Sequence, residues 1–325
     1  MPERQPGAPL PTNDELGLIR RRPAPQHGWR KLIHRASGGM LNPRESQRDV
    51  FERALIDRIN QPVYGDYSIA VLSMKGGVGK TTVTVGLGVT FAALRGDRVI
   101  AFDANPDFGT LSQRGPLETR STVRDLLSDN DISRYSDIRR HTSQGSSRLE
   151  ILASERDPAV SEGFSEAEYR TALYMLQRFY NIILTDCGTG LVHSTMEGIL
   201  DEADALVVVA APAADAARSG LATLDWLKHH GYSHLVSDAV IVVNSSRPGP
   251  IPVDMGKFAS NFLSHVRAVH PIPFDRHLAE GAEVSLDLMS RETRHAFMGL
   301  AATITDRFGN AAHLPPGQPE YRRLR

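Results

Sequence analysis

Cysteine is almost absent from this chain, since Cys187 is the only one in 325 residues. A single cysteine excludes an intrachain disulfide and a structural zinc cluster built from cysteines. The sequence also lacks the about 18 consecutive apolar residues that a membrane-spanning helix needs, and its first residues lack the apolar core of a signal peptide. We therefore expect a cytoplasmic protein without a transmembrane segment, whose membrane contact would be peripheral or through a partner.

A dominant charge is missing as well, because the formal net charge is -1 at pH 7. This balance argues against a protein that binds a polyanion through its bulk charge. The histidines are scattered without the His-Glu-x-x-His spacing of a zinc site, and neither Gly-x-Ser-x-Gly nor a Cys/His nucleophile arrangement occurs. No internal repeat is evident. With an ordinary apolar content of 41%, the sequence predicts a globular protein whose chemistry resides in another kind of motif.

Glycine, in contrast, is concentrated in the stretch that organises the rest of the chain, residues 67–82. The apolar run at 69–72 predicts a buried strand, and the residues at 80–94 predict a helix with Gly96 as its C-cap. Three glycines lie between these two elements. A strand, a glycine loop, Gly-Lys-Thr and a helix in this order are typical of a phosphate-binding P-loop.

The residue types of this loop match the chemistry of a polyphosphate. Glycines allow consecutive backbone N–H groups to converge on an anion, and the following helix directs its positive end at the same place. Lys80 supplies a mobile charge for the terminal phosphates, and the Thr81 hydroxyl supplies a ligand for Mg²⁺. A glycine turn that only joins a strand to a helix is the alternative, but it leaves the Lys-Thr pair unexplained. The predicted nucleotide-binding residues are Gly76, Gly77, Val78, Gly79, Lys80, Thr81 and Thr82.

One position departs from the usual P-loop. Met74 stands where a glycine is expected five residues before Gly79, and a second lysine, Lys75, lies directly before Gly76. The string Lys-Gly-Gly-Val-Gly-Lys-Thr-Thr resembles the deviant P-loop (deviant Walker A motif) of the MinD/ParA family of ATPases. The resemblance implies that ATP and Mg²⁺ are the cofactors and that nucleotide holds two subunits together as a homodimer. It also implies that Lys75 reaches across the interface to the phosphates bound by the other subunit.

A second motif follows a strand predicted at 98–103. Asp103, Asn105 and Asp107 lie in the sequence Asp-Ala-Asn-Pro-Asp, which resembles the family's Asp-x-Asp-Pro motif. The second carboxylate of that motif orients the attacking water, whereas an asparagine can orient water but cannot accept its proton. We therefore interpret Lys75, Asp103 and Asn105 as the catalytic residues of a slow ATPase, in which Asp107 could replace the missing carboxylate. A helix cap after the strand is the alternative role of Asp103.

A third acidic residue, Asp186, ends the strand predicted at 181–186 and precedes Cys187-Gly-Thr-Gly190. An acid at the carboxyl end of a strand near a P-loop usually holds Mg²⁺, often through water. The segment resembles the family's Walker B and switch II sequence, and its glycines suit a loop that rearranges with the γ-phosphate. We expect Thr81 and Asp186 to bind the metal, and Cys187 to be a packing residue. A strand-end cap is the alternative for Asp186.

Two further positions are assigned from the resemblance. Asn244 follows a strand predicted at 239–243, where an asparagine in the family contacts adenine. Pro273 lies in Ile-Pro-Phe-Asp, which looks like the family's Ile-Pro-x-Asp loop that closes over the base. The resemblance therefore implies that Asn244 and Pro273 bind the cofactor, and simple turn chemistry is the alternative for both.

Four segments are expected along the chain. Residues 1–28 are rich in proline and arginine and predict a disordered tail, either a docking arm for a partner or a solvated tail. Residues 29–66 predict a helical segment, with apolar residues at helical spacing from Val50 to Ile59 that cover the next domain. The ATPase domain is expected at 67–308 and a C-terminal tail at 309–325.

Strands and helices alternate through the domain at 67–308, with an irregular polar surface loop expected at 130–148. The alternation predicts an α/β fold with a mostly parallel, doubly wound sheet flanked by helices, of the deviant Walker A type of P-loop NTPase. Ligands of such sheets bind at the carboxyl ends of the strands. One site should therefore collect the residues named above.

We interpret the chain as an ATP-binding, dimerising switch ATPase with slow hydrolysis. Gly-Trp-Arg and a Gly-Gly pair ahead of the P-loop also resemble the entry segment of MinD/ParA-like proteins of actinobacterial type VII secretion. That resemblance implies regulation of secretion through a protein partner at the N-terminal segment or the dimer surface. Two alternatives stay open: a partition-type ATPase that binds non-specific DNA, which the near-neutral charge disfavours, and a non-catalytic scaffold that binds nucleotide for stability.

Overall fold

The structure, a computed structural model, describes residues 35–37, 46–73, 75–105, 109–154, 164–188, 190, 194–251 and 253–310. Its internal contacts divide the chain after Ala54, so that the first half of helix α2 (Gln47–Ile59) belongs to one unit and its second half to the other. The tail expected at 1–28, most of the tail expected at 309–325, Met74 and Asp107 lie outside the described residues.

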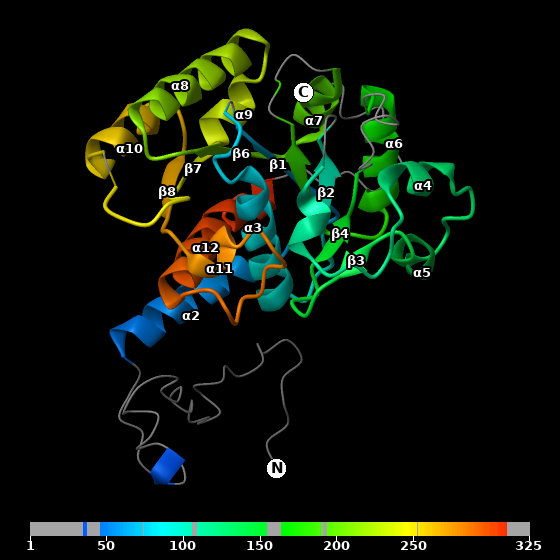
Figure 1. The fold of residues 1–325 in the computed structure, drawn as a ribbon, viewed down its shortest axis with the longest axis horizontal. Helices are drawn as coiled ribbons and strands as arrows, with labels where there is room; N and C mark the ends of the chain where they lie inside the picture. Colours follow the sequence, from blue (N-terminus) through cyan, green and yellow to red (C-terminus); the bar gives the residue numbers. More distant parts are fainter. Residues whose placement is uncertain are drawn as a thin grey trace, which may run out of the picture. The chain divides into compact units, whose positions relative to one another are not determined.

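The second unit is built on an eight-stranded sheet in the order β3-β4-β2-β5-β1-β6-β7-β8 (Figure 1). Neighbouring strands pair in parallel, except that β3 and β4 are antiparallel. The mostly parallel sheet that the alternation of elements predicted is therefore confirmed. The strands are β1 (Tyr67–Leu72), β2 (Val99–Ala104), β3 (Ser143–Gln144), β4 (Glu150–Leu152), β5 (Ile182–Cys187), β6 (Ala205–Ala210), β7 (Val240–Asn244) and β8 (Ala268–Ile272).

The central strands are apolar because helices cover both of their faces. β1, β2, β5, β6 and β7 are buried along their whole length, as their continuous apolar runs predicted. The two outer strands differ from them. β3 is only two residues long, and β8 is mostly half-buried and contains Pro271, which has no backbone N–H.

Helices lie on both sides of the sheet, so the predicted doubly wound architecture is confirmed. They are α2, α3 (Lys80–Leu94), α4 (Val123–Ser128), α5 (Tyr135–Arg139), α6 (Glu166–Gln177), α7 (Ser194–Glu202), α8 (Ala214–His229), α9 (Ser233–Asp238), α10 (Met255–Leu263), α11 (Arg276–Ala279) and α12 (Arg291–Thr305), with the short 3-10 helices η1 (Leu111–Arg114) and η2 (Phe308–Asn310). One apolar core packs α3 and α12 against the sheet, together with Leu55 and Ile59 of α2. The other core packs α4 to α10 against the opposite face.

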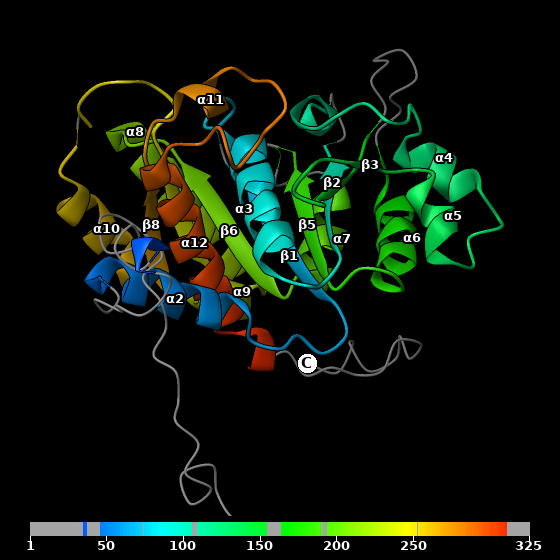
Figure 2. The ribbon, with the colours of Figure 1, turned by 90° about the horizontal axis from the view of Figure 1, so that it is seen from below.

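The P-loop helix α3 runs side by side with α12 in front of the strands (Figure 2). Glycine makes this close packing possible, because a Cβ at Gly86 would lie 2.2 Å from the ring of Phe297. Among the described residues, α3 and the other helices are all too short or too polar to cross a bilayer.

The predicted end of α3 at Leu94 is confirmed, but the predicted cap was wrong. The helix ends at Leu94, and Arg95 is its C-cap in an extended conformation (φ -104°) with its N–H donating to Phe91 O, so Gly96 is not the cap. Tertiary contacts hold Arg95 in this position. Its guanidinium donates to the carbonyls of Ile59 and Gln61. A local glycine signal was therefore overridden by contacts with a distant segment.

The prediction of an irregular loop at 130–148 was wrong in part, because this segment contains α5 and β3. The carboxylate of Glu150, which is buried in β4, organises this segment. It accepts hydrogen bonds from the hydroxyls of Tyr135 (2.5 Å), Thr142 (2.6 Å) and Tyr180 (2.6 Å). The polar composition of residues 130–148 indicated a surface loop. The buried acid that orders them, Glu150, lies outside this segment, after its last residue.

Candidate functional site

The carboxyl ends of the central strands bring together the residues that the motifs singled out. The glycine loop connects β1 to α3, and Asn244 is the last residue of β7. Asp103 in β2 and Asp186 in β5 are direct neighbours in the sheet register. β5 lies beside β1, so both carboxylates are close to the start of α3.

Asp186 is the hub of this arrangement. Its buried carboxylate accepts from Lys80 Nζ at 2.8 Å, from Thr81 Oγ1 at 2.6 Å and from Thr84 Oγ1 at 3.1 Å. Burial alone would lower the pKa of Lys80, but the charge and hydrogen bond of Asp186 raise it above its usual value. The lysine is therefore held as a cation. Thr84 was missed by the sequence analysis, although its position one helical turn after Lys80 puts it on the same face of α3.

Asp103 lies next to this hub and is also fully buried. Burial, followed by the charge of Asp186, raises the pKa of Asp103 to about 7. Two backbone N–H groups oppose this shift, those of Asn105 and Leu111, which donate to the two carboxylate oxygens at 3.1 Å. Two carboxylates and one lysine in a buried space favour the arrival of further positive charge. Across the described ranges no group of three or more His, Cys, Asp or Glu side chains could hold a metal by itself.

The glycine loop has a conformation that other residues rarely adopt. Gly77 and Gly79 have φ angles of 75° and 88°, in the left-handed region. The Asn244 side-chain amide donates to Val78 O at 2.8 Å and packs under the loop, where a Cβ at Gly79 would lie 2.2 Å from its nitrogen. Asn244 therefore supports the loop in this structure, and its contact with adenine stays a prediction.

The outer lysine of the loop has a partner in its own chain. Lys75 Nζ lies 2.6 Å from Asp215 Oδ2, in the first turn of α8, and both side chains are more than half exposed. The hydrogen bond and charge of Lys75 lower the pKa of Asp215. The sequence analysis did not single out Asp215, because 140 residues separate it from Lys75.

The remaining predicted residues lie at the rim of the same strand ends. Asn105 directly follows β2, and Pro273 directly follows β8. The Asp275 carboxylate after Pro273 accepts from the N–H groups of Leu278 and Ser290, so it shapes the turn into α11. Cys187 is buried in the core and its pKa is raised to about 12 by burial, which agrees with the expected packing role.

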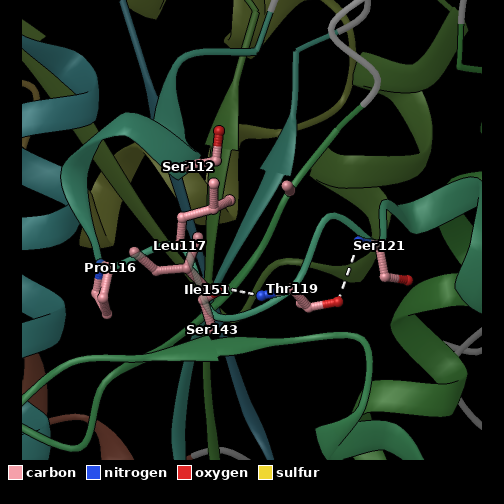
Figure 3. Close-up of a pocket in the computed structure, with 8 residues that line it drawn as sticks. Ser112, Pro116, Leu117, Thr119, Ser121, Ser143 and Ile151 are labelled. Atoms are coloured by element: carbon pink, nitrogen blue, oxygen red, sulfur yellow. Dashed lines mark hydrogen bonds between the residues drawn. The ribbon is translucent and has the colours of Figure 1, made fainter.

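A separate small hollow lies between η1 and β4 (Figure 3). Its lining includes Ser121, whose hydroxyl lies 2.6 Å from His141 Nδ1, while His141 Nε2 lies 3.1 Å from Asp129. The backbone N–H groups of Glu118 and Thr119 beside this hydrogen-bonded Ser121–His141–Asp129 series both donate to Ser143 Oγ, so neither is free to stabilise an oxyanion. The hollow contains none of the predicted nucleotide-binding residues.

Comparison with known proteins agrees with this geometry. The family described as the CobQ/CobB/MinD/ParA nucleotide binding domain matches residues 69–280, from β1 to the end of α11. The ESX-1 secretion-associated protein EspI of Mycobacterium tuberculosis is 36% identical over 288 residues, which cover 88% of this chain and 43% of that protein. The chain thus spans less than half the length of this relative.

Solved structures show the same fold. A ParA family ATPase from Chlorobium tepidum has a TM-score of 0.60 at 17% identity, covering 73% of this chain and 98% of its own. The septum site-determining protein MinD from Pyrococcus horikoshii, complexed with Mg-ADP, has a TM-score of 0.59 at 22% identity, covering 77% and 100%. The chain belongs to the CobQ/CobB/MinD/ParA family of nucleotide-binding domains.

Proposed function

We propose that this chain is an ATPase that binds ATP with Mg²⁺ between two copies of itself and uses the nucleotide as a switch. One observation carries the proposal: Asp186 receives hydrogen bonds from both Lys80 and Thr81 at the start of α3, below the left-handed glycine loop. This is the set of side chains that a nucleotide with its metal requires.

The donors around the loop fit the cofactor. Gly76 and Gly77 are exposed, so their N–H groups are accessible to phosphate oxygens, and Lys80 supplies a cation below them. Thr81 and Asp186 offer hydroxyl and carboxylate oxygens, the ligands that Mg²⁺ prefers. The bound metal would neutralise phosphate charge. Asn244 and Pro273 would line the base, as the family resemblance implies.

Hydrolysis is expected to be slow. Asn105 stands at the position where the family's acidic motif has its second carboxylate, and an amide cannot accept a proton from water. Asp103 is adjacent, but its carboxylate already accepts two backbone N–H groups and is buried. A slow step suits a switch, because the nucleotide-bound state then persists.

Dimerisation is proposed to depend on Lys75. The exposed ion pair with Asp215 is of the kind that contributes little stability, so Lys75 can exchange this partner for a phosphate bound by a second copy. The observation that motivates this step is that Lys75 precedes the glycine loop and lies at its surface. Through the similarity to a secretion-associated protein, we propose that the dimer regulates a protein partner in secretion.

Light scattering with and without ATP and Mg²⁺ tests the proposal. Wild type should double its mass with ATP and Mg²⁺, Lys75→Ala should stay monomeric, and Asp215→Ala, the matched control, should dimerise at equal or lower ATP concentration. Dimerisation of Lys75→Ala at wild-type ATP concentrations would refute the bridging role. Equal increases of the melting temperature with ATP and ADP, without a change of mass, would favour a scaffold instead of a switch.

A further inference from the structure

Arg114 connects three parts of the nucleotide site, although no motif pointed to it. It is the last residue of η1, the 3-10 helix that follows β2 and its Asp103 in the chain. Its Nη2 donates to Thr82 Oγ1 at 3.1 Å and its Nη1 donates to Leu278 O at 3.2 Å. Its own carbonyl accepts from Val284 N at 3.0 Å. The guanidinium therefore lies between the first turn of α3 and the segment that follows β8.

The charge of this side chain is not matched by an acid. In the described part of the chain, the guanidinium makes no ion pair, and both of its acceptors are neutral oxygens. It is half-buried, and burial lowers the pKa of Arg114 although the charge of Asp186 opposes this. A guanidinium has five N–H donors in a planar fork, and two of them are used here. A half-buried cation with free donors gains most from an anion.

The hydroxyl of Thr82 is a second hydrogen-bond donor beside Arg114. This buried hydroxyl accepts from Arg114, so its own proton is available as a donor to a third group. Thr82 follows Lys80 and Thr81 on the first turn of α3, where the helix N-terminus favours a negative charge. Arginine, hydroxyl and helix end therefore present donors to the same small region.

We propose that Arg114 binds a phosphate of the nucleotide and fixes the Thr82 hydroxyl as a second donor to it. This inference rests on the proposed function and extends the phosphate site to a residue outside the recognised motifs. The anion is assigned as a phosphoryl group of a nucleoside polyphosphate, because Arg114 contacts Thr82 in the first turn of α3, directly after the glycine loop. Arg114 is then a binding residue. Its contact with Leu278 O connects the proposed phosphate site to the segment after Pro273, which is proposed to line the base.

Binding measurements on the full chain test this role. Arg114→Gln should weaken the affinity for ATP and for ADP by about 10- to 100-fold, since a hydrogen bond to a charged group is lost. Arg114→Lys should fall between this variant and wild type, because it keeps the charge but loses the fork. The affinity for adenosine should be the same in all three proteins, since adenosine has no phosphate.

Arg267 offers a matched control. It is half-buried like Arg114 and donates to the carbonyls of Asp238 and Thr303, at the other end of β8. Arg267→Gln should lower the melting temperature of the ligand-free protein and leave the ATP affinity unchanged. Arg114→Gln should lower the ATP affinity and leave the melting temperature of the ligand-free protein unchanged. If Arg114→Gln binds ATP as tightly as wild type, or loses ATP and adenosine affinity equally, Arg114 stabilises the fold and does not bind phosphate. If wild type binds no nucleotide, the proposed function itself fails.

Discussion

Replacing Asp103 with asparagine is expected to stabilise the ligand-free protein at alkaline pH while impairing its function. Burial, together with the charge of Asp186, raises the pKa of Asp103 from 3.8 to about 7. An ionised carboxylate at this position therefore costs free energy that an uncharged amide does not. A buried group whose ionised form carries such a cost is a candidate for a functional role.

The size of the effect follows from the shift of the pKa. At about 1.36 kcal/mol per pKa unit, ionised Asp103 destabilises the metal-free fold by roughly 4 kcal/mol. Asparagine has a single acceptor oxygen for the N–H groups of Asn105 and Leu111, and the hydrogen bond it loses costs about 1–3 kcal/mol. Asp103→Asn is therefore expected to raise the free energy of unfolding at alkaline pH by on the order of 1–3 kcal/mol.

The sign of the pH dependence is fixed by the direction of the shift. Because the folded-state pKa is higher than the unfolded value, native Asp103 holds a proton between about pH 4 and pH 7 that the unfolded chain has released. The stability of the wild type should therefore fall as the pH rises through this window. The advantage of Asp103→Asn should be present above the window and disappear towards its lower end.

Urea unfolding in EDTA, without nucleotide, at about pH 5 and about pH 8 measures this difference. Asp215→Asn is the control, because Asp215 is an exposed carboxylate and its loss should change the stability little at either pH. Added ATP and Mg²⁺ should stabilise the wild type and have less effect on Asp103→Asn. The reasoning fails if Asp103→Asn and wild type differ by the same free energy at both pH values.

Three further changes have defined outcomes. Asn105→Asp should raise steady-state ATP turnover at least about tenfold, since it supplies a carboxylate that can accept a proton, and an unchanged phosphate-release rate would contradict this. Gly79→Ala should abolish ATP binding in calorimetry, because its φ is 88° and its Cβ would meet the amide of Asn244 at 2.2 Å, and wild-type affinity would show that the loop can rearrange. Tyr180→Phe should lower the free energy of unfolding by about 1–2 kcal/mol, as Glu150 loses one of its hydroxyl donors, and a smaller loss in urea unfolding would mean that water replaces the hydroxyl.

The part of the site that could be predicted from sequence is the part encoded by contiguous residues. The loop before α3, Asp103 and Asp186 each follow a short apolar run that favours a buried strand, and parallel strands end on the same side. The alternation of elements predicted the doubly wound sheet for the same reason. Local patterns of this kind need no knowledge of distant residues.

The contacts that escaped prediction join residues far apart in the chain. Arg114 reaches Thr82 across 32 positions and Leu278 across 164, and the sequence around Arg114 carries no motif that links it to either residue. The C-cap of α3 was mispredicted because Arg95 binds carbonyls more than 30 residues earlier, at Ile59 and Gln61. Such side chains are placed by the tertiary fold, and composition or periodicity does not specify which carbonyl they meet.

The outer strands of the sheet bear on how copies of this protein can meet. β3 has two residues and runs against its neighbour, and Pro271 interrupts the row of donors on β8. Such borders offer a poor template for lateral growth of the sheet into a fibre. In the homodimer proposed above, the two copies would meet instead at the carboxyl ends of the strands, through the same face of each copy, so that no open interface remains for a third copy. Hydrolysis of the shared nucleotide would then separate the two copies of the proposed dimer.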